Sequence, residues 1–111
     1  MKTPNPNFLN GVPELLLLQL LSDREMYGYE LVKAIQERTS GLLAFGEGCV
    51  YPILHALEQD GAVKSQRREM VGRTRNYYRL TGRGKRRLVA LSADWDRAVR
   101  GVSLVLGGQH A

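Results

Sequence analysis

The chain has 111 residues, 43% of them hydrophobic and 24% charged, which is the composition of one globular domain. Its single cysteine rules out an intrachain disulfide and suits the cytoplasm, and no apolar run approaches the roughly 20 residues that a membrane span needs. The net charge of +5 is unevenly spread, because Lys64 to Arg87 holds ten basic residues and one acid, so we expect a polyanionic partner, either nucleic acid or an anionic membrane.

The first predicted helix runs from about Pro13 to Ser22. Proline suits a first helical position, and Glu14 lies near the positive end of the helix dipole. The leucines that follow make this helix apolar on nearly every side, so it must be covered on more than one face. In so small a domain, we expect a second subunit to supply the second cover.

Two amphipathic helices follow, from about Tyr27 to Thr39 and from about Cys49 to Asp60. Each has apolar residues at helical spacing, which predicts a buried stripe on one side. Proline is tolerated only within the first turn of a helix, so Pro52 predicts that the second of these helices begins near Cys49. The predicted stripes are Gly28, Leu31, Val32 and Ile35 in the first helix, and Val50, Ile53, Leu54 and Leu57 in the second.

A hairpin and a long helix complete the chain. The expected strands cover about Val63 to Glu69 and Arg75 to Leu80, and a glycine-containing loop over Met70 to Thr74 joins them. Thr81 is a suitable N-cap for a last helix that ends near Leu106.

The last helix carries a regular apolar seam. Leu88, Trp95 and Val102 are seven residues apart, and a second series with the same period, offset by three, forms the heptad pattern of a coiled coil. The seam either packs on its own domain or pairs with a partner helix. Because the first helix also has surplus apolar surface, we expect a homodimer. The second series is Leu91, Ala98 and Val105.

These elements predict a mainly α fold with a small β-hairpin: a winged helix-turn-helix over residues 8–81 and a C-terminal dimerisation helix over residues 82–106. In helix-turn-helix proteins, the second helix of the pair enters the major groove. That helix has no Arg or Lys on its outward side, so the basic segment must supply most of the affinity. The first outward positions of the helix are Cys49, Tyr51, Pro52 and His55, and Arg73 and Arg75 flank the wing tip.

Three motifs occur in the order that this fold requires: MYGYEL at Met26–Leu31, GCVYPIL at Gly48–Leu54 and GRTRNYYRLT at Gly72–Thr81. Together they resemble the PadR family of transcriptional regulators over about Leu9 to Trp95, and the single C-terminal helix resembles the compact branch of that family. One departure is Cys49-Val50, where the family more usually has Thr-Leu, so the helix cap that the Thr hydroxyl offers is lost.

The resemblance implies a dimeric bacterial repressor that binds inverted repeats in DNA. In several members of the family, aromatic or phenolic small molecules release the DNA. The resemblance also implies that Tyr29, Tyr51 and the wing arginines touch DNA, and that Gly48 begins the motif of the recognition helix.

Several of these residues have a second interpretation. Tyr51 is either a DNA contact or a partly buried helix tyrosine, and Tyr29 is either a phosphate contact or a packing residue of its helix. His55 is either a groove contact or a solvated surface histidine. Arg73 and Arg75 either bind phosphates or the minor groove, or form a solvated face.

No metal site, cofactor or catalytic group is expected. One cysteine and two histidines do not give a zinc spacing, and Cys49 is a small apolar residue or, as the alternative, a redox-sensing thiol at a helix N-terminus. Trp95 either fills the dimer core or lines an interface cavity for a flat aromatic effector, to which Leu91 and Leu18 would also contribute.

The sequence therefore predicts a DNA-binding transcriptional regulator, and specifically a dimeric repressor that a small effector releases. The alternative is a winged helix that binds only other proteins, which the charge of the basic segment opposes. An enzyme is not expected, and neither is a membrane-surface protein, because most of the basic residues fall on a hairpin. The remaining cations oppose the dipole at the start of the last helix, so we expect some to reach the DNA backbone: Arg83, Lys85, Arg86 and Arg87.

Overall fold

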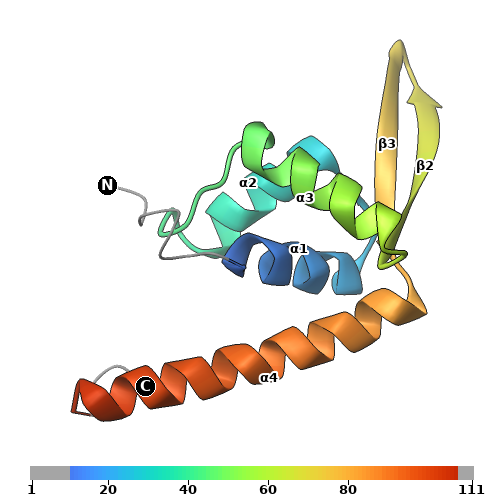
Figure 1. The fold of residues 1–111 in the computed structure, drawn as a ribbon. Helices are drawn as coiled ribbons and strands as arrows, with labels where there is room; N and C mark the ends of the chain where they lie inside the picture. Colours follow the sequence, from blue (N-terminus) through green and yellow to red (C-terminus); the bar gives the residue numbers. More distant parts are fainter. Residues whose placement is uncertain (1–10, 108–111) are drawn as a thin grey trace.

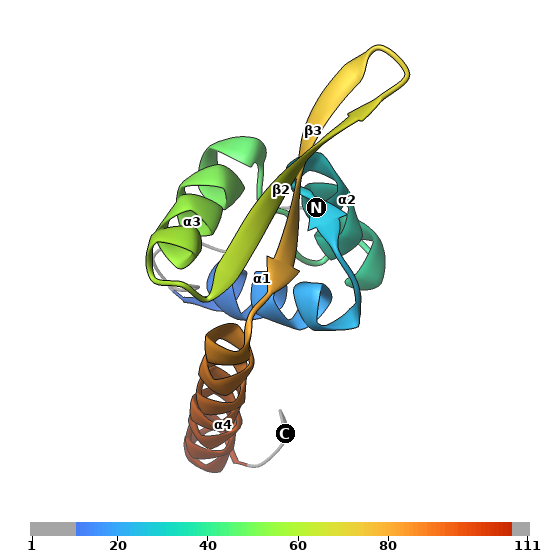
Figure 2. The ribbon, with the colours of Figure 1, turned by 90° about the vertical axis from the view of Figure 1, so that its right-hand side faces the viewer.

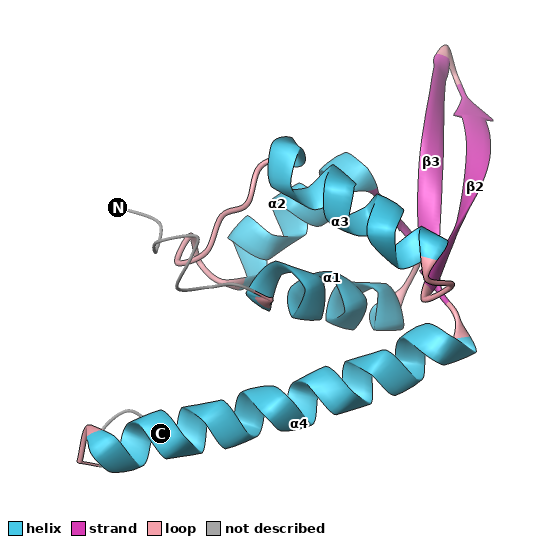
Figure 3. Cartoon of the chain, viewed as in Figure 1, coloured by secondary structure: helices cyan, strands magenta, loops and turns pink. Residues whose placement is uncertain are grey.

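The computed structural model describes residues 11–107. A group of helices carries a projecting hairpin, and a long helix runs along the side opposite to the hairpin tip (Figures 1 and 3). All four predicted helices and both predicted strands are present, so the winged helix-turn-helix fold is confirmed. In chain order the elements are α1 (Val12–Asp23), β1 (Met26–Tyr27), α2 (Gly28–Arg38), α3 (Glu47–Gln59), β2 (Val63–Met70), β3 (Arg73–Leu80) and α4 (Gly82–Val105).

Helix α1 forms the centre of the molecule, because helices lie on both sides of it. Leu17 and Leu18 are fully buried in the core. In Figure 1, α2 and α3 lie on one side of α1 and α4 lies on the other. Leu88 and Leu91 of α4 pack against the core. The expectation that a second subunit supplies the other cover of α1 is therefore corrected, because α4 of the same chain lies there.

Helix α3 begins two residues earlier than predicted. Gly46 is its N-cap, and its carbonyl accepts hydrogen bonds from the amides of Cys49 and Val50, at 3.0 Å each. Pro52 therefore lies inside the helix rather than in its first turn, which corrects the expected start at Cys49. Pro52 has no N–H to donate to the carbonyl of Gly48, but Gly48 is exposed, so water can take the place of the missing bond.

The sheet has three antiparallel strands in the order β1-β3-β2. The hairpin turn consists of Val71 and Gly72, so it is shorter than the five-residue loop that the sequence predicted. Gly72 takes the positive φ of 73° that the turn requires. Strand β1 was not predicted, because it has two residues and exists only through its pairing with Tyr77 and Tyr78 of β3.

Among the described residues of helix α4, Leu88 and Leu91 pack on the hydrophobic core, and Gly84 and Ser103 are buried. Thr81 is its N-cap, as predicted, and its hydroxyl oxygen accepts a hydrogen bond from the Gly84 amide at 3.1 Å. Gly84 is buried, and a Cβ there would clash with the backbone carbonyl oxygen of Ala62, so only glycine allows this approach. Farther along, Trp95 is 47% exposed and Val102 is 57% exposed. Among residues 11–107, no helix is long and apolar enough to cross a membrane.

Candidate nucleic-acid interface

Helix α3 turns one face to the core and the other to solvent. Val50, Leu54 and Leu57 are buried, as the stripe predicted. On the opposite side, Gly48, Pro52 and His55 are exposed, and Cys49 is half-buried. The open face contains no basic residue, and its charged groups are acids: Glu47 and Glu58. Charge attraction to phosphate must therefore come from other elements.

Tyr51 does not point outward with His55. Its side chain is half-buried, packs against the core, and lies across the first residue of α2. A Cβ on Gly28 would lie 2.6 Å from both Cζ and the hydroxyl oxygen of Tyr51, so any larger residue at this position would displace the Tyr51 ring. Burial, and then the charge of Glu47, raise the pKa of the Tyr51 hydroxyl. Tyr51 is therefore partly buried, and it also lines the hollow beside the hairpin described below.

Tyr29, in the first turn of α2, is 50% exposed. The ammonium group of Lys33, one turn later, lies 5.8 Å from the centre of its ring. Tyr29 therefore does not fill the core, and both its ring and the neighbouring cation face solvent beside the start of α2.

A small hollow connects the start of α2, the start of α3 and the hairpin. Its volume is about 210 Å³, and Tyr51 and Arg75 line it. The hollow thus brings two predicted site residues together with side chains that were not predicted. Thr74 and Asn76 had a usable signal in the sequence, because they are the immediate neighbours of the predicted residue Arg75. The remaining lining residues are Tyr27, Gly28, Thr74 and Asn76.

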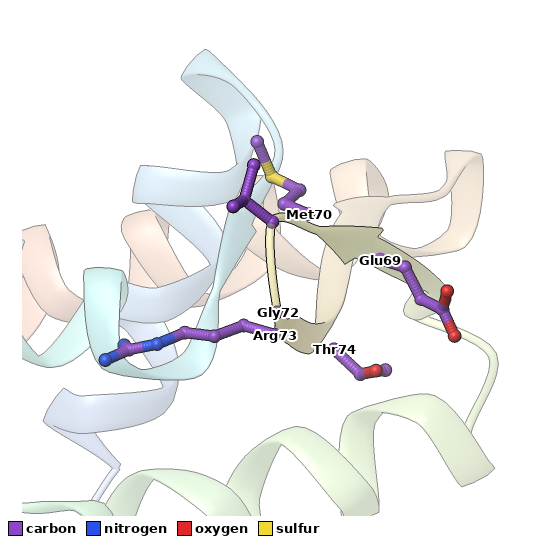
Figure 4. A pocket seen from close by; sticks show the side chains of 6 residues that line it. Glu69, Met70, Gly72, Arg73 and Thr74 are labelled. Carbon is purple, nitrogen blue, oxygen red and sulfur yellow. The ribbon is translucent and has the colours of Figure 1, made fainter.

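The tip of the hairpin is exposed and has two sides. In Figure 4, Arg73 extends to one side of the hairpin, whereas Glu69 and Thr74 extend to the other. Val71 at the turn is fully exposed and Met70 is 53% exposed. The predicted wing residue Arg73 is thus freely accessible from solvent, and it lies next to exposed apolar side chains.

Arg75 is half-buried because its guanidinium stacks on an aromatic ring. Its Cζ lies 4.3 Å from the centre of the Tyr27 ring, and the guanidinium of Arg68 lies 4.7 Å from the centre of Tyr77. The two rings meet edge to face, with 5.4 Å between their centres. Each cation is therefore held in a fixed position on a tyrosine, instead of moving freely in solvent.

Two of the four cations at the start of α4 form ion pairs within the chain. Arg83 pairs with Asp60 at 3.1 Å, and Arg87 pairs with Glu14 at 2.7 Å and with Asp60 at 3.6 Å. The hydrogen bond from Arg83 holds the pKa of Asp60 below its usual value, and the one to Glu14 raises the pKa of Arg87. Ion pairs within the chain therefore hold two of the four cations, and α4 begins at the foot of the hairpin, far from its tip (Figure 1).

A second hollow lies between α1 and α4, with a volume of about 300 Å³. Leu91 and Trp95, two of the predicted effector residues, line it together with Leu15. The third, Leu18, is fully buried in the core and does not line this hollow. The other lining residues are Gly11, Val12, Asp94 and Ala98. Within residues 11–107, no group of three or more His, Cys, Asp or Glu residues is placed to hold a metal ion.

Comparison with solved structures agrees with this architecture. A transcriptional regulator from Clostridium thermocellum superposes with a TM-score of 0.82 at 28% identity, covering 87% of this chain and 95% of the other. A PadR family transcriptional regulator from Eggerthella lenta superposes with a TM-score of 0.80 at 29% identity, covering 90% and 86% of the two chains.

Sequence comparison leads to the same group of proteins. The transcriptional regulator Rv3488 of Mycobacterium tuberculosis is 34% identical over 92% of this chain and 90% of its own length. The model of the family "Transcriptional regulator PadR-like family" matches residues 17–90. The resemblance noted in the three motifs is thereby confirmed: the chain belongs to the PadR-like family, whose members are DNA-binding transcriptional regulators and not enzymes.

Proposed function

We propose that this protein is a cytoplasmic, homodimeric transcriptional repressor that a small aromatic molecule releases from DNA. The observation that carries the proposal is the position of the open face of α3, which lies beside a hairpin rich in positive charge. In this arrangement α3 enters the major groove and the hairpin binds the adjacent backbone. The residues proposed to contact DNA are Tyr29, Gly48, Cys49, Tyr51, Pro52, His55, Arg73 and Arg75.

The dimer is supported by the far half of α4. The seam positions near the start of the helix pack on the core, whereas Trp95 and Val102 are about half exposed and Val105 is 87% exposed. An exposed heptad seam on a helix is typical of a coiled-coil partner surface. We therefore assign residues 8–81 to DNA binding and 82–106 to dimerisation, of which residues 8–10 lie outside the described part. Two-fold symmetry then requires inverted half-sites about one helical turn apart.

The effector site is proposed in the hollow between α1 and α4. Its volume of about 300 Å³ suits a small ligand, and Trp95 offers an aromatic face next to the apolar Leu15 and Leu91. A ligand there would change the angle between α4 and α1, and so the separation of the two α3 helices in a dimer. The ligand releases DNA only to the extent that it binds the DNA-bound and DNA-free arrangements of the dimer with different affinities.

The test is a titration of the protein on the DNA upstream of its own gene, at several salt concentrations. A specific complex whose log affinity falls steeply with log salt supports the proposal. Binding that is insensitive to salt, or blind to sequence, would instead favour the alternative of a protein–protein module. Trp95 is the only tryptophan, so quenching of its fluorescence by small phenolic acids, followed by loss of the DNA complex, tests the effector site.

A further inference from the structure

The two faces of the β2–β3 hairpin differ in charge. On the face turned toward α3, the Ser65 hydroxyl donates a hydrogen bond to Glu58 at 2.6 Å, and Tyr78 is buried. Side chains alternate along a strand, so the neighbours of these residues lie on the opposite side, which we call the outer face. Figure 2 looks onto this face, and no described helix lies in front of it. The outer face consists of Lys64, Gln66, Arg68, Met70, Arg73, Arg75, Tyr77 and Arg79.

Most of the positive charge of the hairpin lies on this outer face. It has five cations and no acid, whereas the face toward α3 has one cation, Arg67, and one acid, Glu69. The strand register places Lys64 directly opposite Arg79, and Arg68 directly opposite Arg75. Like charges opposite each other destabilise a sheet. Stability of the hairpin therefore does not explain why two such pairs are present.

Part of this charge is held in place by the protein itself. Arg68 pairs with Glu25 and stacks on Tyr77, and Arg75 stacks on Tyr27. Within residues 11–107, no ion pair is formed by the other three outer-face cations, which are all exposed: Lys64, Arg73 and Arg79. The outer face is thus an ordered array of cations that has only one internal counter-charge.

We propose that the outer face binds the phosphates of duplex DNA that flanks the operator. This inference rests on the proposed function, because the operator complex holds the flanking duplex next to the hairpin at a high effective concentration. Arg73 and Arg75, nearer the tip, are already assigned to the operator backbone, whereas Lys64 and Arg79, near the foot of the same face, have no partner in that arrangement. An acidic protein would carry the same kind of charge, but nothing else in the complex would hold it there.

The position of the cations also determines the path of the flanking DNA. Arg73 lies at the tip of the hairpin, and Arg79 lies six residues farther along β3, or about 20 Å toward the foot of the hairpin. A straight duplex that passes the tip meets Arg73 but not Lys64 or Arg79. Contact with all three therefore requires the flank to bend toward the outer face.

The experiment uses the full-length protein and an operator selected from a random duplex library. Two duplexes are compared, the minimal operator and the same operator extended by about one helical turn (~10 bp) on each side. The variant is Lys64→Gln with Arg79→Gln. The matched control is Arg38→Gln with Arg97→Gln, which also removes two exposed cations, each from a surface ion pair away from the hairpin. Dyes at the ends of the extended duplex report bending.

We expect the wild type and the control to bind the extended duplex about tenfold or more tighter than the minimal one at low salt, and to bend it. The Lys64/Arg79 variant should bind both duplexes equally, without bending, and lose about 3–4 units of salt slope on the extended duplex, for four contacts in a dimer. Its melting temperature should not fall, because a like-charge pair is removed.

The inference is wrong if the flanking DNA adds no affinity for the wild type. It is also wrong if the affinity of the variant falls by the same factor for both duplexes while the extended duplex is still bent. Either result leaves the proposed function intact, because the minimal operator is still bound. If the wild type selects no operator at all, the proposed function fails first, and this inference fails with it.

Discussion

The ring of Tyr51 in α3 lies over Gly28 in α2, with Cζ 2.6 Å from the place that a Cβ on Gly28 would occupy. This contact joins the starts of the two helices that form the helix-turn-helix. Since the two residues are 23 positions apart, the contact depends on how α2 and α3 fold together.

Gly28→Ala is expected to destabilise the protein by about 1–3 kcal/mol, because the added methyl group forces the Tyr51 ring out of its place. Chemical denaturation measures this loss. In a Tyr51→Ala background, the same substitution should cost almost nothing, because the ring is absent. Equal losses of stability in both backgrounds would show that the contact with Tyr51 does not determine which residue fits at position 28.

Tyr51→Phe separates the two roles of that side chain. The ring and its packing on Gly28 stay, so stability should change by no more than about 0.5 kcal/mol. If the hydroxyl contacts a phosphate, operator affinity should fall about fivefold, the equivalent of one hydrogen bond of about 1 kcal/mol. Unchanged affinity would assign Tyr51 to packing alone.

Sequence patterns predicted the elements whose signal is local. The stripe of Val50, Leu54 and Leu57 repeats within one helix, so it identifies the buried side without knowledge of the fold. Strand β1 has no such pattern, since two residues become a strand only when β3 pairs with them. The predicted start of α3 was wrong because it assumed that proline occurs only in the first turn of a helix. Pro52 is tolerated farther inside, since the carbonyl of Gly48 that loses its hydrogen bond is reached by solvent.

The candidate site was predicted less completely than the fold, and again the missing part is non-local. The basic residues of the hairpin are evident in the sequence, but their division between two faces follows from strand register. The ion pair of Arg87 with Glu14 joins residues 73 positions apart, and no local pattern indicates it. A count of cations alone therefore does not show which of them form ion pairs within the protein.

Arg87→Gln should leave operator affinity and salt slope within about twofold of the wild type, because Arg87 is already paired with Glu14 and Asp60. The pair is partly exposed, so stability should fall by no more than about 1 kcal/mol. Arg73→Gln is the comparison: it should weaken binding and reduce the salt slope by about 1 per subunit. A steep loss of affinity in Arg87→Gln would restore the earlier expectation that this cation reaches the backbone. Electrophoretic shift at several salt concentrations measures all three proteins.

Asp60 should make stability depend on pH in a defined direction. The hydrogen bond from Arg83, followed by the charges of Arg83 and Arg87, keeps the pKa of Asp60 below its ordinary 3.8 in the folded state, although burial opposes this. Because its charged form is favoured on folding, its contribution is present above pH 3.8 and is lost as the pH falls through the lowered pKa. Asp60→Asn should therefore melt below the wild type near pH 7, and the difference should close in acid. A constant difference at every pH would show that the effect of the substitution is not electrostatic.

The far half of α4 gives a test of dimerisation with an internal control. Val102 and Leu104 are both exposed, at 57% and 80%, but only Val102 lies on the heptad seam. Val102→Glu places a charge where the partner helix is expected, so it should shift the protein toward monomer and weaken operator binding. Leu104→Glu adds the same charge two residues away, outside the seam, and should leave the mass measured by light scattering unchanged. If both substitutions dissociate the protein equally, the contact does not follow the seam. If neither does, the dimer forms through another surface, and the seam's exposed half needs a different partner.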